Sequence, residues 1–183
     1  MTPGRGLFGP TVDRLDERFD LALEKVRDNG SLARVFQVAS ALGDFSLIWH
    51  LFGVARGTTS DRRAVQALAL SALLGAESLI VNQGVKRLFR RERPTASGDE
   101  RFEVRTPTTS SFPSGHASSA VFAAMILSAF GGRRWTPVWF AVASVVAISR
   151  AVVRIHHASD VAGGAVIGAV LGAVARRAVR RLS

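Results

Sequence analysis

The sequence predicts an all-α integral membrane protein, a bundle of about five transmembrane helices preceded by an amphipathic helix. Two observations lead to this fold class. Of the 183 residues 48% are hydrophobic, and the mean hydropathy of +0.21 is positive although the formal net charge is +10. Long uncharged segments also separate the basic residues, which collect at the segment ends, as in membrane proteins. No recognisable nucleic-acid-binding motif accompanies the charge, so we expect no nucleic-acid partner.

Five apolar segments are candidates for membrane spans. They run over residues 32–55, 64–85, 117–130, 135–148 and 161–175. A spanning helix needs roughly 20 residues, so the last three segments need their polar flanks to lie near headgroups or a water-filled site. The first two contain carboxylates, Asp44 and Glu77. We expect these to form interhelical hydrogen bonds or, alternatively, to line a substrate cavity.

The region before the first span divides into two parts. Residues 1–10 are rich in proline and glycine and predict a disordered tail. Over residues 11–30, apolar residues recur at steps of three and four, with Thr11 as the expected N-cap and Asn29 in the stop signal. This pattern predicts an amphipathic helix on the membrane surface or against the bundle. By length, residues 11–183 form a single membrane-embedded domain.

Glycines recur on one face of the last apolar segment, at Gly164, Gly168 and Gly172. Small residues at this spacing permit close approach between helix backbones. The face is expected to pack inside the bundle, or alternatively to form the seam of a homodimer.

A long basic connection, residues 86–113, joins the second and third spans and is the expected active-site loop. It contains seven basic residues: Lys86, Arg87, Arg90, Arg91, Arg93, Arg101 and Arg105. As a generic loop it would bind lipid headgroups. Lys86 and Arg93, however, are seven apart and would share one face of a continuing helix, which Pro94 would end.

The start of the third span predicts an anion site. Ser114 is the expected cap of the new helix, which leaves the backbone N–H groups of Gly115 and His116 unpaired. Helix N-termini of this kind attract phosphate. His116 stands where it could donate a proton.

Charged and imidazole side chains also cluster between the fourth and fifth spans, where a lipid-facing helix gains nothing from them. His156 and Asp160 are four apart, which on a helix places both on one face. The carboxylate would then accept a proton from one imidazole nitrogen and leave the other as base or nucleophile. Arg150 adds a permanent cation suited to an anionic substrate.

Topology brings these groups together, because with five spans all the helix ends that carry them emerge on one membrane face. The cations form an anion cradle, while the histidines and Asp160 supply proton transfer and nucleophilicity. The sequence shows neither an acidic cluster suited to magnesium nor a zinc-like spacing, so no metal and no cofactor are expected. Metal-independent phosphoryl transfer through a phosphohistidine is the simplest chemistry.

Three motifs carry a resemblance to a known family. They are Lys86 with Arg93-Pro94, then Pro113-Ser114-Gly115-His116, then Ser149-Arg150 with His156 and Asp160. In order and spacing they resemble the three-part signature of the type 2 phosphatidic acid phosphatases, a superfamily that includes vanadium haloperoxidases and bacterial acid phosphatases.

The resemblance implies a role for each residue. His156 is the implied nucleophile, Asp160 orients it, and His116 protonates the leaving group. The implied phosphate-binding residues are Lys86, Arg93, Ser114, Gly115 and Arg150. His157 has no counterpart in the motif.

We therefore expect a membrane lipid phosphate phosphatase. Candidate substrates are polyprenyl pyrophosphate or phosphate, phosphatidylglycerol phosphate, phosphatidic acid and a prenyl-linked sugar phosphate. The alternatives are a lipid phosphotransferase on the same site and a non-catalytic lipid-phosphate binding or transport protein. Basic residues on the face opposite the site predict, by the positive-inside rule, a bacterial cell membrane protein with an extracytoplasmic active site.

Overall fold

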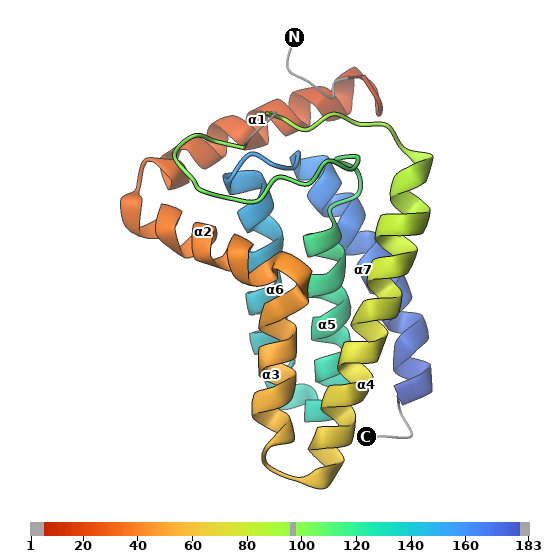
Figure 1. The fold of residues 1–183 in the computed structure, drawn as a ribbon. Coiled ribbons are helices and arrows are strands. Elements are labelled where there is room, and N and C mark those ends of the chain that lie inside the picture. Colours follow the sequence, from red (N-terminus) through yellow and green to blue (C-terminus); the bar gives the residue numbers. More distant parts are fainter. Residues whose placement is uncertain (1–5, 96–97, 180–183) are drawn as a thin grey trace.

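The computed structural model describes residues 6–95 and 98–179, which form helices joined by loops (Figure 1). The helices are α1 (Pro10–Arg27), α2 (Gly30–Gly43), α3 (Leu47–Gly57), α4 (Asp61–Ser78), α5 (Gly115–Gly131), α6 (Thr136–Val152) and α7 (Ala158–Val179). Short turns of helix are η1 (Asp44–Ser46), η2 (Leu79–Gly84), η3 (Val85–Leu88) and η4 (Arg133–Trp135). The expected all-α fold class is confirmed.

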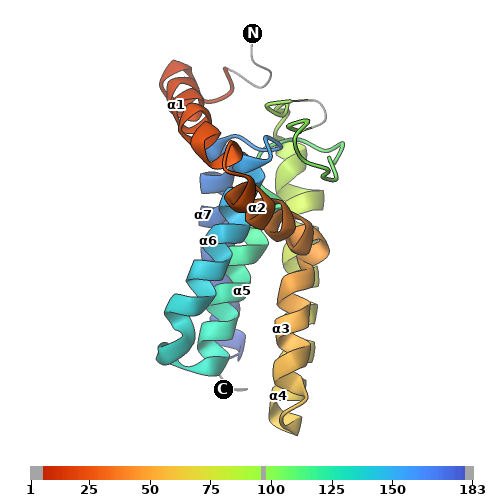
Figure 2. The same cartoon turned by 90° about the vertical axis from the view of Figure 1, so that its left-hand side faces the viewer.

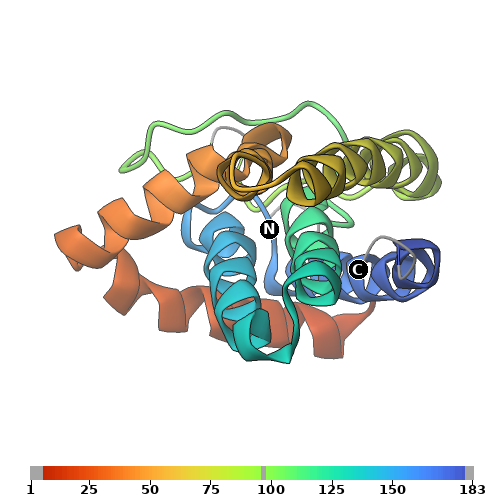
Figure 3. The same cartoon turned by 90° about the horizontal axis from the view of Figure 1, so that it is seen from below.

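Four helical stretches of the described chain are long and apolar enough to cross a membrane. They are Gly30–Gly57, Asp61–Leu88, Arg133–Val152 and Ala158–Val179, and α5 is a shorter apolar helix. With 17 residues, α5 has a length of about 26 Å. It lies among α4, α6 and α7 (Figure 3), so its faces contact protein more than lipid. The protein is thus an integral membrane protein.

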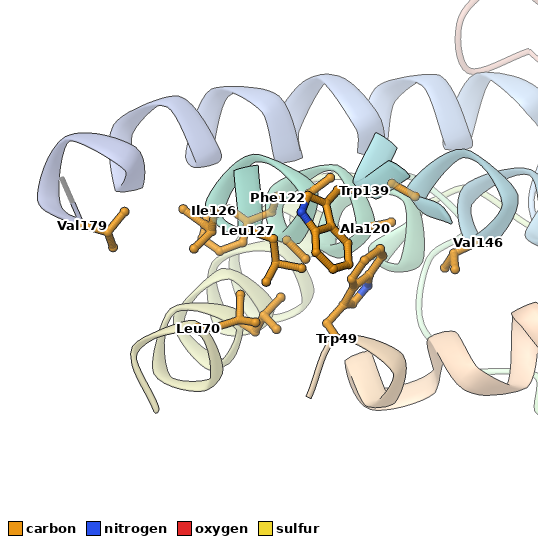
Figure 4. Packing of buried hydrophobic residues seen from close by; sticks show 13 residues of the cluster. Trp49, Leu70, Ala120, Phe122, Ile126, Leu127, Trp139, Val146 and Val179 are labelled. Atoms are coloured by element: carbon orange, nitrogen blue, oxygen red, sulfur yellow. The ribbon is translucent and has the colours of Figure 1, made fainter. Parts of the chain in front are cut away.

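The bundle core gathers around α5 (Figure 4). Phe122 and Leu127 of α5 pack with Trp49 of α3, Leu70 of α4 and Trp139 of α6, and all five are buried. Because every surrounding helix contributes to one apolar cluster, the helix ends that carry the polar residues are held in a fixed relation.

The glycine face of α7 packs against α5 inside the chain. A Cβ added at Gly164 or Gly168 would collide with the carbonyl oxygens of Ser114 and Ser118. At Gly172 it would lie 2.8 Å from the sulfur of Met125. The face considered for a homodimer seam is therefore filled by α5, because only glycine permits this close approach.

The first apolar segment is not one continuous helix, contrary to expectation. Phe45 (φ 52°) and Ser46 (φ 60°) adopt left-handed backbone between α2 and α3, a strained conformation for residues other than glycine. As a result α2 crosses the bundle end obliquely while α3 runs alongside α4 (Figures 1 and 2). Gly43 at this break packs against His116, where a Cβ would lie only 2.5 Å from the ring.

Helix α1 lies across the ends of α6 and α7 (Figure 2). It begins at Pro10 after an N-cap at Gly9, so Thr11 is not the cap, and Asn29 caps α2 instead. Arg27 donates from Nε to Val152 O (2.8 Å) and from Nη2 to the neighbouring carbonyl (3.0 Å), which satisfies the C-terminus of α6. This docks α1 against the bundle.

The predicted N-terminal tail is only partly within the described residues, since residues 1–5 lie outside them. Beyond these, Phe8 packs edge-on against Phe112, with ring centroids 4.8 Å apart, and also contacts Phe89. The segment before α1 is therefore packed onto the long loop.

Candidate active site

The structure brings the sequence-predicted residues to the end of the bundle covered by α1 (Figure 1). Lys86 lies in η3, Arg93 in the long loop, Ser114 at the N-cap of α5, and Gly115 and His116 in its first turn. Arg150 ends α6, His156 lies between α6 and α7, and Asp160 begins α7. Lys86, Arg93, Ser114, Arg150, His156 and Asp160 are all buried.

His156 does not share a helix with Asp160, because α6 ends at Val152 and α7 starts at Ala158. Its Nδ1 is 3.6 Å from Asp160 Oδ2, beyond normal hydrogen-bond length. The Ser111 hydroxyl bridges the two groups, 3.4 Å from Nδ1 and 2.5 Å from Oδ2. Ser111 thus joins the histidine to the carboxylate.

The imidazole of His156 is neutral. Burial lowers the pKa of His156 to about 3, the nearby charge of Arg93 acts in the same direction, and Asp160 opposes both. On the other side of the ring, Arg93 Nη1 donates toward Nε2 at 3.3 Å. Because a guanidinium can only donate, Nε2 carries the lone pair of the neutral ring, and the ring proton lies on Nδ1, the nitrogen nearer Ser111 and Asp160.

The Asp160 carboxylate is held by several donors. Oδ1 accepts from Arg91 Nη1 at 2.5 Å, and Oδ2 accepts from the His157 backbone N–H at 2.9 Å as well as from Ser111. Its backbone oxygen accepts from Ser114 N at 3.0 Å, which joins the starts of α5 and α7. These contacts with separate parts of the chain fix the orientation of the Asp160 carboxylate.

Arg93 is fixed by three backbone carbonyls from two separate segments. Its guanidinium donates to the carbonyl oxygens of Pro107 (3.0 Å), Thr109 (3.1 Å) and Ile155 (3.0 Å). The expected continuous helix from Lys86 to Arg93 is not formed, because the helical turn ends at Leu88. The two cations approach each other because the loop folds back, and both line an open cavity of about 960 Å³.

Arg150 is buried differently. Its Nη1 donates to the Ser40 hydroxyl of α2, but Nε and Nη2 have no hydrogen-bond partner within the described part of the chain. The side chain is 1% exposed. Buried donors without partners are costly, so these two nitrogens are candidate binding groups for an acceptor.

His116 is paired with an intramembrane carboxylate. Its Nε2 lies 3.1 Å from Asp44 Oδ1 and 3.3 Å from Ser40 O. Of the two expectations for such carboxylates, Asp44 joins the site. Glu77 instead accepts an interhelical hydrogen bond from Ser118.

Sequence reasoning missed Ser40, Arg91 and Ser111 as neighbours of the reactive groups. Arg91 lies in a run of basic residues, and nothing in the sequence distinguishes it as a residue whose side chain is buried. Ser40 and Ser111 carry no recognisable signal, because their contacts come from segments far away in the sequence.

Comparisons with known proteins agree with this geometry. Residues 64–183 match the PAP2 superfamily. The decaprenylphosphoryl-5-phosphoribose phosphatase of Mycolicibacterium smegmatis is 34% identical over 127 residues, 68% of this chain and 67% of the relative. The protein of that name from Mycobacterium tuberculosis is 32% identical over 157 residues, 76% of this chain and 85% of the relative.

A solved structure shows the same fold. The crystal structure of a transmembrane PAP2 type phosphatidylglycerolphosphate phosphatase from Bacillus subtilis superposes with a TM-score of 0.73 at 22% identity, covering 96% of this chain and 89% of that one. The chain belongs to the PAP2 superfamily and is a membrane lipid phosphatase.

Proposed function

We propose that the chain hydrolyses the phosphomonoester of a prenyl-linked sugar phosphate, without a metal ion, through a phosphohistidine on His156. Among the candidate lipids this class is favoured because two relatives that match most of the chain are decaprenylphosphoryl-5-phosphoribose phosphatases. The other candidates differ in the leaving group, whereas the phosphoryl group and its binding residues are common to all.

One observation carries the proposal: the unpartnered Nε and Nη2 of the buried Arg150. A phosphoryl group supplies acceptor oxygens and negative charge, which match these donors. Lys86 and Arg93 would bind further oxygens, and the α5 N-terminus offers the backbone N–H of Gly115, since that of Ser114 already donates to Asp160 O. These groups would neutralise the equatorial oxygens in the transition state.

The proposed reaction has two steps. His156 Nε2 attacks phosphorus in line, the bond to the sugar oxygen breaks, and His116 donates its proton to that oxygen. A water then attacks the phosphohistidine, His116 removes its proton, and inorganic phosphate leaves. Asp160 stabilises the imidazolium formed in the first step, as a triad carboxylate does, and Asp44 holds His116.

We also propose that the site faces the extracytoplasmic side. The end of the bundle opposite the site carries the α3–α4 turn, η4 and the end of α7. Its basic residues are Arg56, Arg62, Arg63, Arg133, Arg134, Arg176 and Arg177. The positive-inside rule assigns that end to the cytoplasm.

Phosphate release in detergent tests the proposal. The panel comprises decaprenylphosphoryl-5-phosphoribose, a polyprenyl pyrophosphate, phosphatidylglycerol phosphate and phosphatidic acid, with His156→Ala as control. The first substrate should give the highest kcat/KM, orthovanadate should inhibit, and EDTA should have no effect. A preference for another lipid would reassign the substrate, and strong EDTA sensitivity would contradict the mechanism. Transfer of phosphate to an added alcohol in preference to water would indicate the phosphotransferase.

A further inference from the structure

A buried ion-pair network connects the reactive groups to α1. Arg91 donates from Nη1 to Asp160 Oδ1 at 2.5 Å and from Nη2 to Asp16 Oδ2 at 2.8 Å. Arg91 is 4% exposed and Asp16 is 7% exposed, so solvent screens these charges little. Asp16 belongs to α1, outside the residues 64–183 that match the superfamily.

Asp16 also holds the first turn of α7. Its Oδ1 accepts from the backbone N–H of Ser159 at 2.8 Å, and its Oδ2 accepts from the Ser159 hydroxyl at 2.6 Å. Ser159 immediately precedes Asp160, and a carboxylate is favourable at a helix N-terminus, where backbone N–H groups are unpaired. Arg91 donates to the same hydroxyl at 2.7 Å. The Asp16 carboxylate therefore constrains Asp160 in two ways. It holds the backbone of the preceding residue, Ser159, and it binds Arg91, the ion-pair partner of the Asp160 side chain.

The net charge of this network determines the electrostatic potential at His156. Asp16 and Asp160 share the single guanidinium of Arg91, so the three groups together carry one net negative charge. If Asp16 were neutral, Arg91 would cancel the charge of Asp160. His156 gains positive charge when Nε2 bonds to phosphorus, and Asp160 Oδ2 is 3.6 Å from its Nδ1. Loss of the net negative charge would therefore raise the barrier to the chemical step.

We propose that Asp16 is a positioning residue of the active site, which acts through Arg91 and Ser159 to keep Asp160 oriented and negatively charged toward His156. This inference rests on the nucleophilic role proposed for His156. It makes α1 part of the catalytic unit rather than only a helix at the membrane surface.

The test is Asp16→Asn, assayed with the substrate for which the wild-type enzyme shows the highest kcat/KM. We expect kcat to fall about tenfold or more, the usual effect of removing an outer partner of a reactive group. KM should change little, because Lys86, Arg93 and Arg150 are untouched. A wild-type kcat in Asp16→Asn would overturn the proposal.

Asp20→Asn is the matched control. Asp20 lies one turn further along α1 and pairs with Arg154 Nη2 (2.7 Å) and Arg27 Nη2 (2.6 Å), but not with Asp160. Asp20→Asn removes an ion pair that docks α1 but leaves every partner of Asp160 in place. We therefore expect kcat to stay within about twofold of wild type. Equal losses of kcat in the two variants would mean that Asp16 only docks the helix, which would overturn the proposal.

A double mutant separates positioning from independent effects. In an Asp160→Asn background, Asp16→Asn should reduce kcat little further, because its target is already neutral. A further loss as large as in the wild-type background would overturn the proposal. If Asp16→Asn does not yield a folded protein, Asp16→Glu decides, since it keeps the charge but moves the carboxylate. Its kcat should be reduced, and an unchanged kcat would contradict the inference.

The two proposals fail differently. A wild-type enzyme that releases no phosphate from any lipid would contradict the proposed function, whereas an active enzyme unaffected by Asp16→Asn would contradict only the role of Asp16.

Discussion

The surroundings of the two histidines His156 and His116 hold their cations in different ways. On the His156 side, Arg93 donates to three backbone carbonyls and Arg91 lies between two carboxylates. On the His116 side, Arg150 has the Ser40 hydroxyl and two buried nitrogens without a partner in the described residues. Under the proposed function, Arg93 is a cation held in place before the substrate binds, whereas Arg150 keeps two donors for the phosphoryl group.

The largest expected effect comes from the two adjacent histidines. His156→Ala should lower kcat by at least about 10³-fold, since it removes the proposed nucleophile. His157 has no counterpart in the motif, and its backbone N–H, which binds Asp160, survives the change of side chain. His157→Ala should therefore retain most of the activity in a phosphate-release assay. The opposite result would reassign the nucleophile to His157.

The paired substitutions Arg150→Met and Arg93→Met test the comparison directly. Both should lower kcat/KM by about 10²-fold or more, because each removes a cation that faces the phosphoryl group. Arg93→Met should also destabilise the free protein, by about 1–3 kcal/mol, since it leaves the buried carbonyl of Ile155 unpaired. Arg150→Met removes two unpartnered donors and one hydrogen bond, to the Ser40 hydroxyl, so it should lower the thermal midpoint in detergent less than Arg93→Met does. An equal or larger loss of stability on Arg150→Met would contradict the assignment of Arg150 as an open anion site.

The smallest expected effect is a pH dependence of stability. Burial lowers the pKa of His156 to about 3, whereas an unfolded chain protonates histidine near about 6.5. The unfolded state thus binds the extra proton first, so this contribution to stability is full above pH ~6.5 and is lost as pH falls toward ~3. The slope should approach about 1.4 kcal/mol per pH unit.

Thermal unfolding in detergent between pH 8 and pH 4.5 (on the order of two units on either side of the histidine pKa) measures this effect. His156→Ala should show a smaller loss over the acid half of the range, with a residual loss from His157, whose pKa burial also lowers. Asp99, with a pKa lowered to about 2 mainly by its hydrogen bond to Arg101, contributes only at lower pH. An identical pH profile in wild type and variant would show that His156 is not buried as a neutral group.

The sequence predicted correctly which residues come together, but it did not predict the backbone conformation that brings them together. Its apolar segments placed four helix ends on one face, and Lys86, Arg93, Arg150 and His156 do meet there. The local geometry was different, because the helix after α4 ends at Leu88. Backbone conformation in loops depends on distant partners, such as the carbonyls that bind Arg93, and these leave no periodic signal.

By itself the sequence determined the membrane class, the helical architecture and the family, because hydrophobic segment length and motif spacing are local properties of the chain. Only the tertiary structure decided which charges pair: Asp16 with Arg91, and Asp44 with His116. Asp16 and Arg91 are 75 residues apart. A buried pair at such a distance forms only because helix packing removes both groups from water, and no local pattern of residues encodes that choice.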